Sequence, residues 1–211
     1  MNNLFEFDKK YEISIIGTDE AGRGPAAGGV FASAVYFHSL SPELIETLSI
    51  LNDSKQLSVK KREMLYPIIL ENTINSTVCV EVEEIEEKNI LNCSLKAMKL
   101  ACEDVIKKAS LSECLVLVDG NRYIKNFDSK QEYVIKGDSK SASIAAASIL
   151  AKCSRDNYMK ELDKEFPQYS WAKNAGYLTA EHINAINTYG ITKYHRKSFL
   201  KKLEARQLSL L

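Results

Sequence analysis

The chain has 211 residues, of which 45% are hydrophobic, and its 28 basic and 28 acidic residues give a formal net charge of zero. This composition predicts one sizeable globular core and excludes a protein whose overall charge draws it to nucleic acid, so any such surface has to be local. Its five cysteines are scattered and lack a C-x-x-C pair, which argues against a disulfide framework or a zinc site. Without a signal peptide or a membrane-spanning apolar run, the sequence predicts a reduced, cytoplasmic protein.

The first predicted element is a strand that leads into two acids. Residues 12–16 (EISII) are mostly β-branched and apolar, which predicts a strand that ends where Asp19 and Glu20 begin. Successive residues of a strand point to opposite faces. The two acids can therefore serve one site only if the chain bends between them or just after them.

A glycine-rich turn follows the acids. Gly22 and Gly24 lack a Cβ and can adopt positive φ, so another backbone can approach closely, and Arg23 lies between two free N–H groups. This pattern predicts a cradle for a phosphate or a ribose. A tight turn with a solvated acid pair fits the same residues equally well.

The remaining elements are predicted from periodicity and from turn and capping residues. Strands are expected at residues 29–37, 73–82, 113–119 and 132–135, and helices at residues 59–70 with Pro67 inside, 89–109, 141–166, 179–188 and 198–208, with Ser58 and Thr179 as N-caps and a loop at residues 169–176. Small residues in the helix at 141–166 would let it lie close to a sheet. The order predicts an α/β protein with a mixed five-stranded sheet flanked by helices in residues 1–166, and a C-terminal helical segment in residues 167–211 packed on the substrate-binding side.

Four acids occur where one site could gather them. Asp19 and Glu20 follow the first strand, Asp119 ends the apolar strand at 113–119, and Asp156 lies on the small-residue helix. An acid at the end of an apolar strand is costly to desolvate unless it is paired or binds a cation. Carboxylate ligands suit Mg²⁺ or Mn²⁺, and two such ions about 3.5 to 4 Å apart would clamp the attacking water and the leaving oxygen of a phosphodiester. The acids therefore predict a metal-dependent phosphoryl-transfer site.

The acids also have structural interpretations. Asp119 can form a turn with Gly120, Asp138 is expected to cap the helix that follows it, and Asp156 can pair with Lys152 one helical turn earlier. Taken singly, Asp156 fits the pairing better than a ligand role. Taken together, the acids recur where the direction of the chain would bring them into one site.

Several motifs make the sequence resemble the type 2 ribonuclease H family, ribonuclease HII. They are DEAGRGP (19–25), DSKQLS (53–58), NIL with AM (89–98), LVDGN (117–121), KGDSKSASIAAASILAKCSRD (136–156), GY (176–177) and HRKSF (195–199). The resemblance covers nearly the whole chain and implies a ribonuclease H-like fold. It implies an endonuclease of DNA replication and repair that hydrolyses the RNA strand of RNA/DNA hybrids and cuts on the 5′ side of ribonucleotides embedded in duplex DNA, removing ribonucleotides and primers. Two-metal-ion hydrolysis with Mg²⁺ or Mn²⁺, giving 3′-OH and 5′-phosphate ends, is implied as well.

The resemblance also assigns residues. The catalytic and metal-binding acids of the family correspond to Asp19, Glu20, Asp119 and Asp156. Its substrate-binding residues correspond to Gly22, Arg23, Gly24, Lys55, Tyr177 and Arg196. Of these, the glycine turn would read the ribose 2′-OH at the RNA-to-DNA junction, and the tyrosine would stack on the following deoxyribose. The sequence departs from the family beside that tyrosine, because Ala175 and Leu178 stand where a basic residue and a second glycine are more frequent.

Two other functions compete with this one. A non-catalytic module that binds RNA/DNA hybrids through the basic residues of 193–206 is disfavoured, because uncompensated acids repel phosphates. A type 3 ribonuclease H would carry an additional N-terminal domain, for which the sequence leaves no room before a first strand that begins within about a dozen residues of Met1.

The last residues of the chain suggest a further partner. Residues 207–211 (QLSLL) resemble the short peptide by which bacterial replication proteins dock on the sliding clamp. The end of an amphipathic helix fits them equally well. The sequence otherwise predicts a monomer that acts on nucleic acid and has no membrane partner.

Overall fold

A mixed five-stranded sheet forms the centre of the protein. The structure is a computed structural model that describes residues 3–52, 54 and 56–201. The sheet has the order β3-β2-β1-β4-β5 and consists of β1 (Ile15–Ala21), β2 (Val30–Tyr36), β3 (Ile74–Val80), β4 (Leu115–Asp119) and β5 (Lys130–Val134). β2 runs antiparallel to β1 and β3, whereas β4 runs parallel to β1 and β5. The predicted fold class is confirmed.

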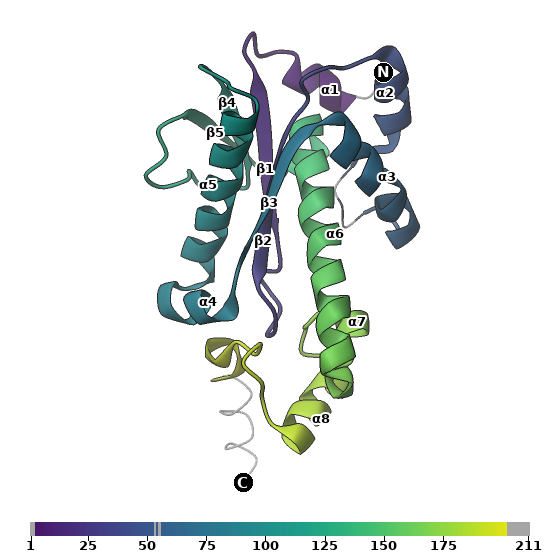
Figure 1. Cartoon of the computed structure of the whole chain (residues 1–211), viewed down its shortest axis with the longest axis vertical. Helices are drawn as coiled ribbons and strands as arrows, with labels where there is room; N and C mark the ends of the chain where they lie inside the picture. Colours follow the sequence, from purple (N-terminus) through teal and green to yellow (C-terminus); the bar gives the residue numbers. More distant parts are fainter. Residues whose placement is uncertain (1–2, 53, 55, 202–211) are drawn as a thin grey trace.

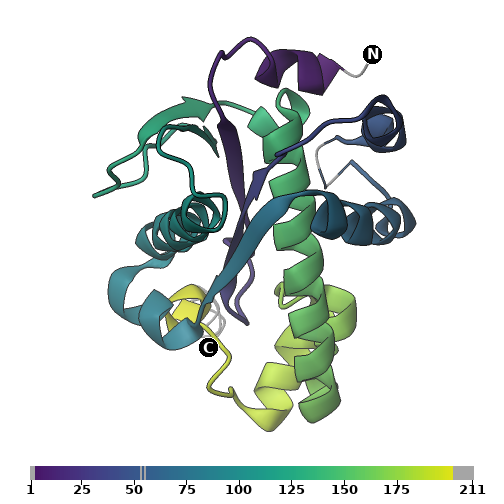
Figure 2. The ribbon, with the colours of Figure 1, turned by 45° about the horizontal axis from the view of Figure 1, so that its top comes forward.

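Helices cover both faces of the sheet (Figure 1). Figure 2 shows α5 (Ile90–Lys108) on one face, and α6 (Ala142–Glu165) with α3 (Val59–Asn72) on the other. Shorter helices are α1 (Asn3–Asp8), α2 (Pro42–Thr47), α4 (Val82–Lys88), α7 (Trp171–Asn174) and α8 (Ala180–Tyr189), with the 3₁₀ turns η1 (Leu48–Ile50), η2 (Gly137–Ser139) and η3 (Pro167–Tyr169). Among the described residues, no helix combines the length and the hydrophobicity that a membrane span requires.

The helix α5 forms because its apolar residues recur at helical spacing. Asn89 caps its N-terminus through a side chain that accepts from the N–H of Asn92. Its buried stripe, which includes Met98 and Val105, packs on the sheet in one of the two main cores. The helix confirms the prediction for residues 89–109, apart from its end residues.

The helix α6 lies unusually close to β1. Gly17 is why it can: a Cβ on this residue would lie 2.2 Å from the backbone carbon of Ser143 and 2.3 Å from the nitrogen of Ile144. The alanines along α6 are buried in the second core and keep the separation small. The helix begins after Ser141, whose hydroxyl accepts from the Ile144 N–H, so the prediction that Asp138 caps this helix was wrong.

The two acids of β1 lie inside the strand rather than after it. β1 continues through Asp19 and Glu20 to Ala21 because β2 stays paired with it, with Ala32 opposite Glu20. The predicted strand at residues 12–16 therefore began and ended too early. The expected bend comes just after the acids, at Gly22, where φ is +96°.

Other predicted boundaries had mixed outcomes. Ser58 and Thr179 cap α3 and α8 as expected, and α3 continues through Pro67 to Asn72. The expected loop at 169–176 is wrong, because η3 and α7 give it helical turns. Residues 197–201 are helical, and the rest of the helix predicted at 198–208 lies outside the described residues.

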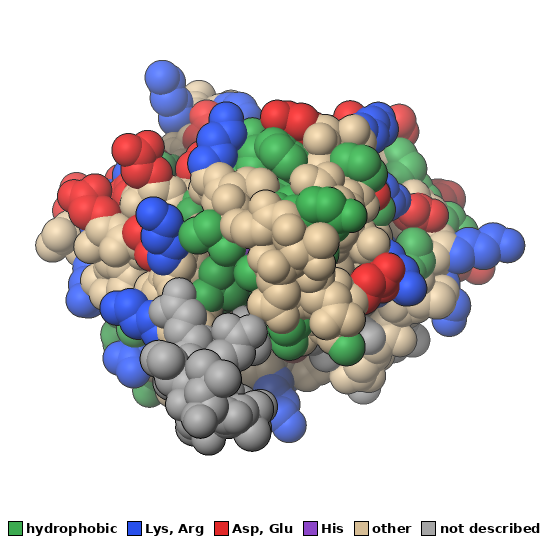
Figure 3. Space-filling view, turned by 90° about the horizontal axis from the view of Figure 1, so that it is seen from below, with side chains coloured by type: hydrophobic (Ala, Val, Ile, Leu, Met, Phe, Trp, Pro, Cys, Tyr) green, Lys and Arg blue, Asp and Glu red, His purple; other side chains and the backbone are tan. Residues whose placement is uncertain are grey.

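A cluster of buried aromatic rings and histidines anchors the segment after α6. Tyr169 stacks on Trp171 with ring centroids 5.0 Å apart. The Nε2 atom of His182 lies 3.1 Å from both Trp171 Nε1 and His195 Nε2. The other ring nitrogen of His182 contacts the carbonyl of Tyr177 at 2.9 Å. The cluster therefore ties α7, α8 and Tyr177 into one unit at the end of the molecule seen in Figure 3, where charged side chains of both signs lie around the hydrophobic ones.

Candidate active site

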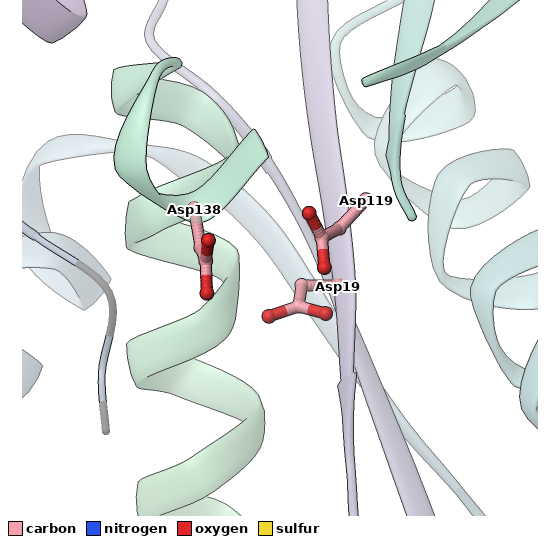
Figure 4. A group of neighbouring side chains, drawn as sticks. All are labelled: Asp19, Asp119 and Asp138. Atoms are coloured by element: carbon pink, nitrogen blue, oxygen red, sulfur yellow. The ribbon is translucent and has the colours of Figure 1, made fainter. Parts of the chain in front are cut away.

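Three carboxylates from separate parts of the chain meet beside α6 (Figure 4). Each of Asp19, Asp119 and Asp138 offers one oxygen, and these oxygens all lie within 4.8 Å of one another. Asp19 is 6% exposed and Asp138 is 8% exposed. Within the described residues, these three side chains are placed closely enough to hold a metal ion together.

The sheet and one turn put these carboxylates in place. Asp19 points toward α6 because it lies two residues after Gly17, on the same face of β1. Asp119 ends the parallel neighbour β4, and its Oδ1 accepts from the Gly137 N–H at 2.6 Å. That hydrogen bond fixes the turn η2, which carries Asp138, against the end of β4.

The electrostatics of the cluster favour a cation. Burial, with the negative charges of Glu20 and Asp119, raises the pKa of Asp19 well above its usual value. Hydrogen bonds from Ser148 and from the Glu20 N–H oppose this rise only in part. A hard divalent cation would relieve the repulsion, and a donor set of carboxylate oxygens is what such an ion prefers. The residues present therefore fit a divalent metal.

Glu20 approaches the same carboxylates from the other face of β1. It lines a small pocket of about 50 Å³ together with Asp119 and Arg122. Its Oε1 also accepts from Arg23 Nη1 at 3.0 Å. Asp19 and Glu20, which are adjacent in sequence, therefore approach Asp119 from opposite faces of β1.

Asp156 lies apart from the three gathered carboxylates. Its Oδ1 pairs with Lys152 Nζ at 2.5 Å, and it lines a separate pocket of about 350 Å³ between α3, α6 and α7. Ser148 of α6 is the residue that contacts Asp19, and Asp156 follows it by eight residues, which is about 12 Å along a helix. The structure thus brings together Asp19 and Asp119 of the predicted set, and adds Asp138.

The predicted glycine turn forms a loop over two buried arginines. We call residues 22–29 the glycine loop. Arg196 donates to the carbonyls of four of its residues, Gly22, Arg23, Pro25 and Gly28. Arg155 donates to the carbonyls of two others, Ala27 and Gly29. Arg155 lies in the motif at 136–156 but is not among the predicted site residues, because a lone arginine on a helix ordinarily lies at the surface.

Tyr177 lies against the glycine loop. A Cβ on Gly24 would be 3.4 Å from Cε1 of the Tyr177 ring. Tyr177 is 52% exposed and so remains open to a ligand. The Ala26 N–H donates to the Gly176 carbonyl at 2.9 Å, which fixes this contact although Ala175 and Leu178 flank the pair.

Lys55 itself lies outside the described residues. Its neighbour Ser54 is described, and the Ser54 hydroxyl lies 2.8 Å from that of Ser148 on α6. Arg62 donates to the Ser54 carbonyl at 2.7 Å. The motif that contains Lys55 is therefore anchored next to the residue that contacts Asp19.

Solved structures share this fold. The ribonuclease H2 of Pyrococcus horikoshii OT3 matches with a TM-score of 0.71 at 23% identity, over 92% of this chain and 98% of that one. The ribonuclease HII of Archaeoglobus fulgidus, solved as a complex with PCNA, matches with a TM-score of 0.69 at 22% identity, over 87% and 94% of the two chains. The fold is that of a ribonuclease H.

Sequence similarity identifies the family within this fold. The family model described as Ribonuclease HII matches residues 16–202. The Ribonuclease HII of Fusobacterium nucleatum subsp. nucleatum is 48% identical over 203 residues, which cover 96% of this chain and 92% of that protein. The chain belongs to the ribonuclease HII family and is an endoribonuclease.

Proposed function

We propose that this protein hydrolyses the RNA strand of RNA/DNA hybrids and cuts on the 5′ side of ribonucleotides embedded in duplex DNA. The observation that carries the proposal is the position of the gathered carboxylates at one end of β1, directly before the glycine loop and Tyr177. The carboxylates that could hold a metal therefore lie next to backbone N–H groups of the glycine loop that could bind the ribose of a nucleotide. This combination fits a nuclease that tests for the 2′-OH before it cuts.

The chain's own residues would bind and orient the substrate. The N–H groups of Arg23 and Gly24 would bind the substrate strand, and the Tyr177 ring would offer a flat surface for the sugar of the next nucleotide. Asp19, Asp119 and Asp138 would hold the metal, with Glu20 as a fourth carboxylate beside Asp119. Mg²⁺ or Mn²⁺, when bound, would neutralise charge on the phosphodiester and lower the pKa of an attacking water.

The fourth catalytic acid is open to a direct comparison. We propose Asp138 for this role, because it lies with Asp19 and Asp119, whereas Asp156 pairs with Lys152. The matched variants are D138N and D156N. We expect D138N to lower kcat at least about 100-fold, since losing a ligand misplaces the reacting groups, and D156N to lower it much less. A large loss in D156N with an active D138N would restore the assignment made from the resemblance.

One substrate separates the candidate functions. A duplex with a single embedded ribonucleotide should be cut at its 5′ side with Mg²⁺ or Mn²⁺, leaving a 3′-OH and a 5′-phosphate, and should stay intact in excess EDTA. Cutting of long hybrids but not of this duplex would favour an activity of the type 3 kind. Tight binding of hybrids without any product would favour a non-catalytic module.

A sliding clamp is a further proposed partner. The Archaeoglobus fulgidus ribonuclease HII was solved as a complex with PCNA. The residues that suggest the same partner here, Gln207 to Leu211, lie outside the described residues. Deleting them should abolish binding to a bacterial clamp while cleavage in the absence of the clamp stays unchanged. Undiminished clamp binding by the shortened chain would contradict this assignment.

A further inference from the structure

The two sides of the glycine loop differ, because its carbonyls face buried arginines on one side. In a trans peptide, the carbonyl of one residue and the N–H of the next point in opposite directions. Arg196 holds the Gly22 carbonyl at 2.7 Å from Nη2 and the Arg23 carbonyl at 3.3 Å from Nη1. The N–H groups of Arg23 and Gly24 therefore point away from the buried guanidinium. Among residues 3–52, 54 and 56–201, neither N–H has an acceptor.

Two other N–H groups of the loop are occupied. The Ala26 N–H donates to Gly176 and the Gly28 N–H donates to Tyr194, each at 2.9 Å. Arg155 holds the carbonyls on this side of the loop, and its Nη1 also donates to Ala175 at 3.0 Å. That last bond joins the loop to the segment that carries Tyr177. The N–H groups of Arg23 and Gly24, which have no such acceptor within the described part of the chain, lie in the part of the loop next to the Tyr177 ring.

The two arginines also leave positive charge under the loop. Arg155 is 2% exposed and Arg196 is fully buried, and neither forms an ion pair with a carboxylate in the part of the chain that is described. Burial, with the charge of Arg155, lowers the pKa of Arg196 to about 9, which still leaves it charged at neutral pH. Fixed positive charge behind outward-facing N–H groups attracts an anion such as a nucleic-acid phosphate.

We propose that Arg155 and Arg196 are positioning residues that turn the glycine loop outward and so set the preference for ribose over deoxyribose. This inference rests on the proposed function, because it explains how that loop reads a sugar. It moves Arg196 from direct contact with the substrate to a role behind the loop, and it adds Arg155. Neither side chain needs to touch the nucleic acid.

Lysine substitutions separate geometry from charge. R155K and R196K keep a cation, but a single ammonium cannot reproduce the planar fork that contacts several carbonyls at once. R62K is the control for the loss of a buried guanidinium, since Arg62 donates to the carbonyls of Ser54 and Leu57 and not to the glycine loop. Any effect of R62K through the motif that contains Lys55 would change the affinity for both duplexes alike and leave the ratio of the two Kd values the same. Thermal unfolding of each variant shows whether it is folded at the assay temperature.

The measurement is binding without cleavage. In EDTA, the Kd for an all-DNA duplex is divided by the Kd for the same duplex with one ribonucleotide. We expect R155K and R196K to lower this ratio at least about tenfold, because a site loses discrimination when its hydrogen-bonding groups are misplaced, and R62K to leave it unchanged. Folded lysine variants with the wild-type ratio, or an equal fall in R62K, would overturn the proposal. A wild-type ratio near one would instead count against ribose reading itself.

A second measurement does not depend on the folding of any variant. In wild-type protein without metal, the ribonucleotide duplex should slow hydrogen exchange at the N–H groups of Arg23 and Gly24 more than the all-DNA duplex does. The occupied N–H groups of Ala26 and Gly28 serve as internal controls and should change equally with both duplexes. Equal protection of Arg23 and Gly24 by both duplexes would contradict the outward orientation as the source of the preference.

Discussion

The substitution G17A tests whether the close contact of β1 and α6 positions the active site. The backbone of Gly17 has ordinary φ, so the added methyl group acts through sterics alone. Its Cβ would lie 2.2 Å from the Ser143 backbone carbon, whereas ordinary contact begins near 3.4 Å, so α6 would have to move by about 1.2 Å. Asp19 lies two residues further along the same face of β1, so the movement of α6 would displace Ser148 from its hydrogen bond with Asp19.

The expected effects follow from that displacement. Overpacking of this kind lowers the free energy of unfolding by about 1 to 3 kcal/mol. Each kcal/mol lost should lower the Tm by about 2 to 4 °C for a chain of this size. A shift of about 1 Å at the reacting groups can cost about 100-fold in rate. Thermal unfolding by circular dichroism and single-turnover cleavage of a ribonucleotide-containing duplex measure the two effects.

G190A is the matched control. A Cβ on Gly190 would meet nothing within 4 Å. The substitution should therefore lower the free energy of unfolding only through the positive φ of this residue, by about 1 to 2 kcal/mol. G190A should therefore lower the Tm modestly and leave the cleavage rate unchanged. If G17A unfolds within about 1 °C of the wild type and cleaves at the wild-type rate, the reasoning from the close contact fails.

Two predictions concern buried ionisable groups. In metal-free protein at neutral pH, D19N should raise the free energy of unfolding, because burial and neighbouring acids raise the pKa of Asp19; wild type should gain stability relative to D19N as the pH falls through that pKa. Mg²⁺ should raise the Tm of wild type but not of D19N, and an equal Mg²⁺ response in both would refute the metal site. Burial lowers the pKa of His195 to about 4, so stability should be lost as the pH falls from about 6.5 toward 4, by up to about 3 kcal/mol, and H195Q should show a flatter dependence in urea unfolding. The same slope in H195Q and wild type would contradict this assignment.

Local patterns predicted the parts of the fold that local forces determine. The helix α5 and the strand β4 carry periodic or continuous apolar residues, and each lies within a few residues of its expected bounds. The helix α4 was missed, because its acidic sequence buries only Val82 and Ile85, too few to show a period. The strand β1 was cut short, because pairing with β2 holds two acids in extended backbone that sequence alone would end.

The site was predicted less completely than the fold. Asp19 and Asp119 were identified because acids at the end of apolar strands demand a partner, and the structure brings them together. A local rule considers only the helix that follows Asp138 and so predicts a helix cap, whereas the position of Asp138 depends on the hydrogen bond from the Gly137 N–H of η2 to Asp119. Arg155 left no local signal at all, because its partners are carbonyls 126 and 128 positions earlier in the chain.

The distance in sequence between the glycine loop and Arg196 has a consequence for biosynthesis. The Gly22 carbonyl is hydrogen-bonded by the guanidinium of Arg196, which is synthesised 174 residues later. Contacts between residues so far apart in sequence form late in folding. A nascent chain that already carries Asp19 and Asp119 would therefore still lack the support under its substrate-reading loop. Selectivity for ribose would be acquired only once Arg196 has been synthesised, so that chains ending before this residue would discriminate poorly between RNA and DNA.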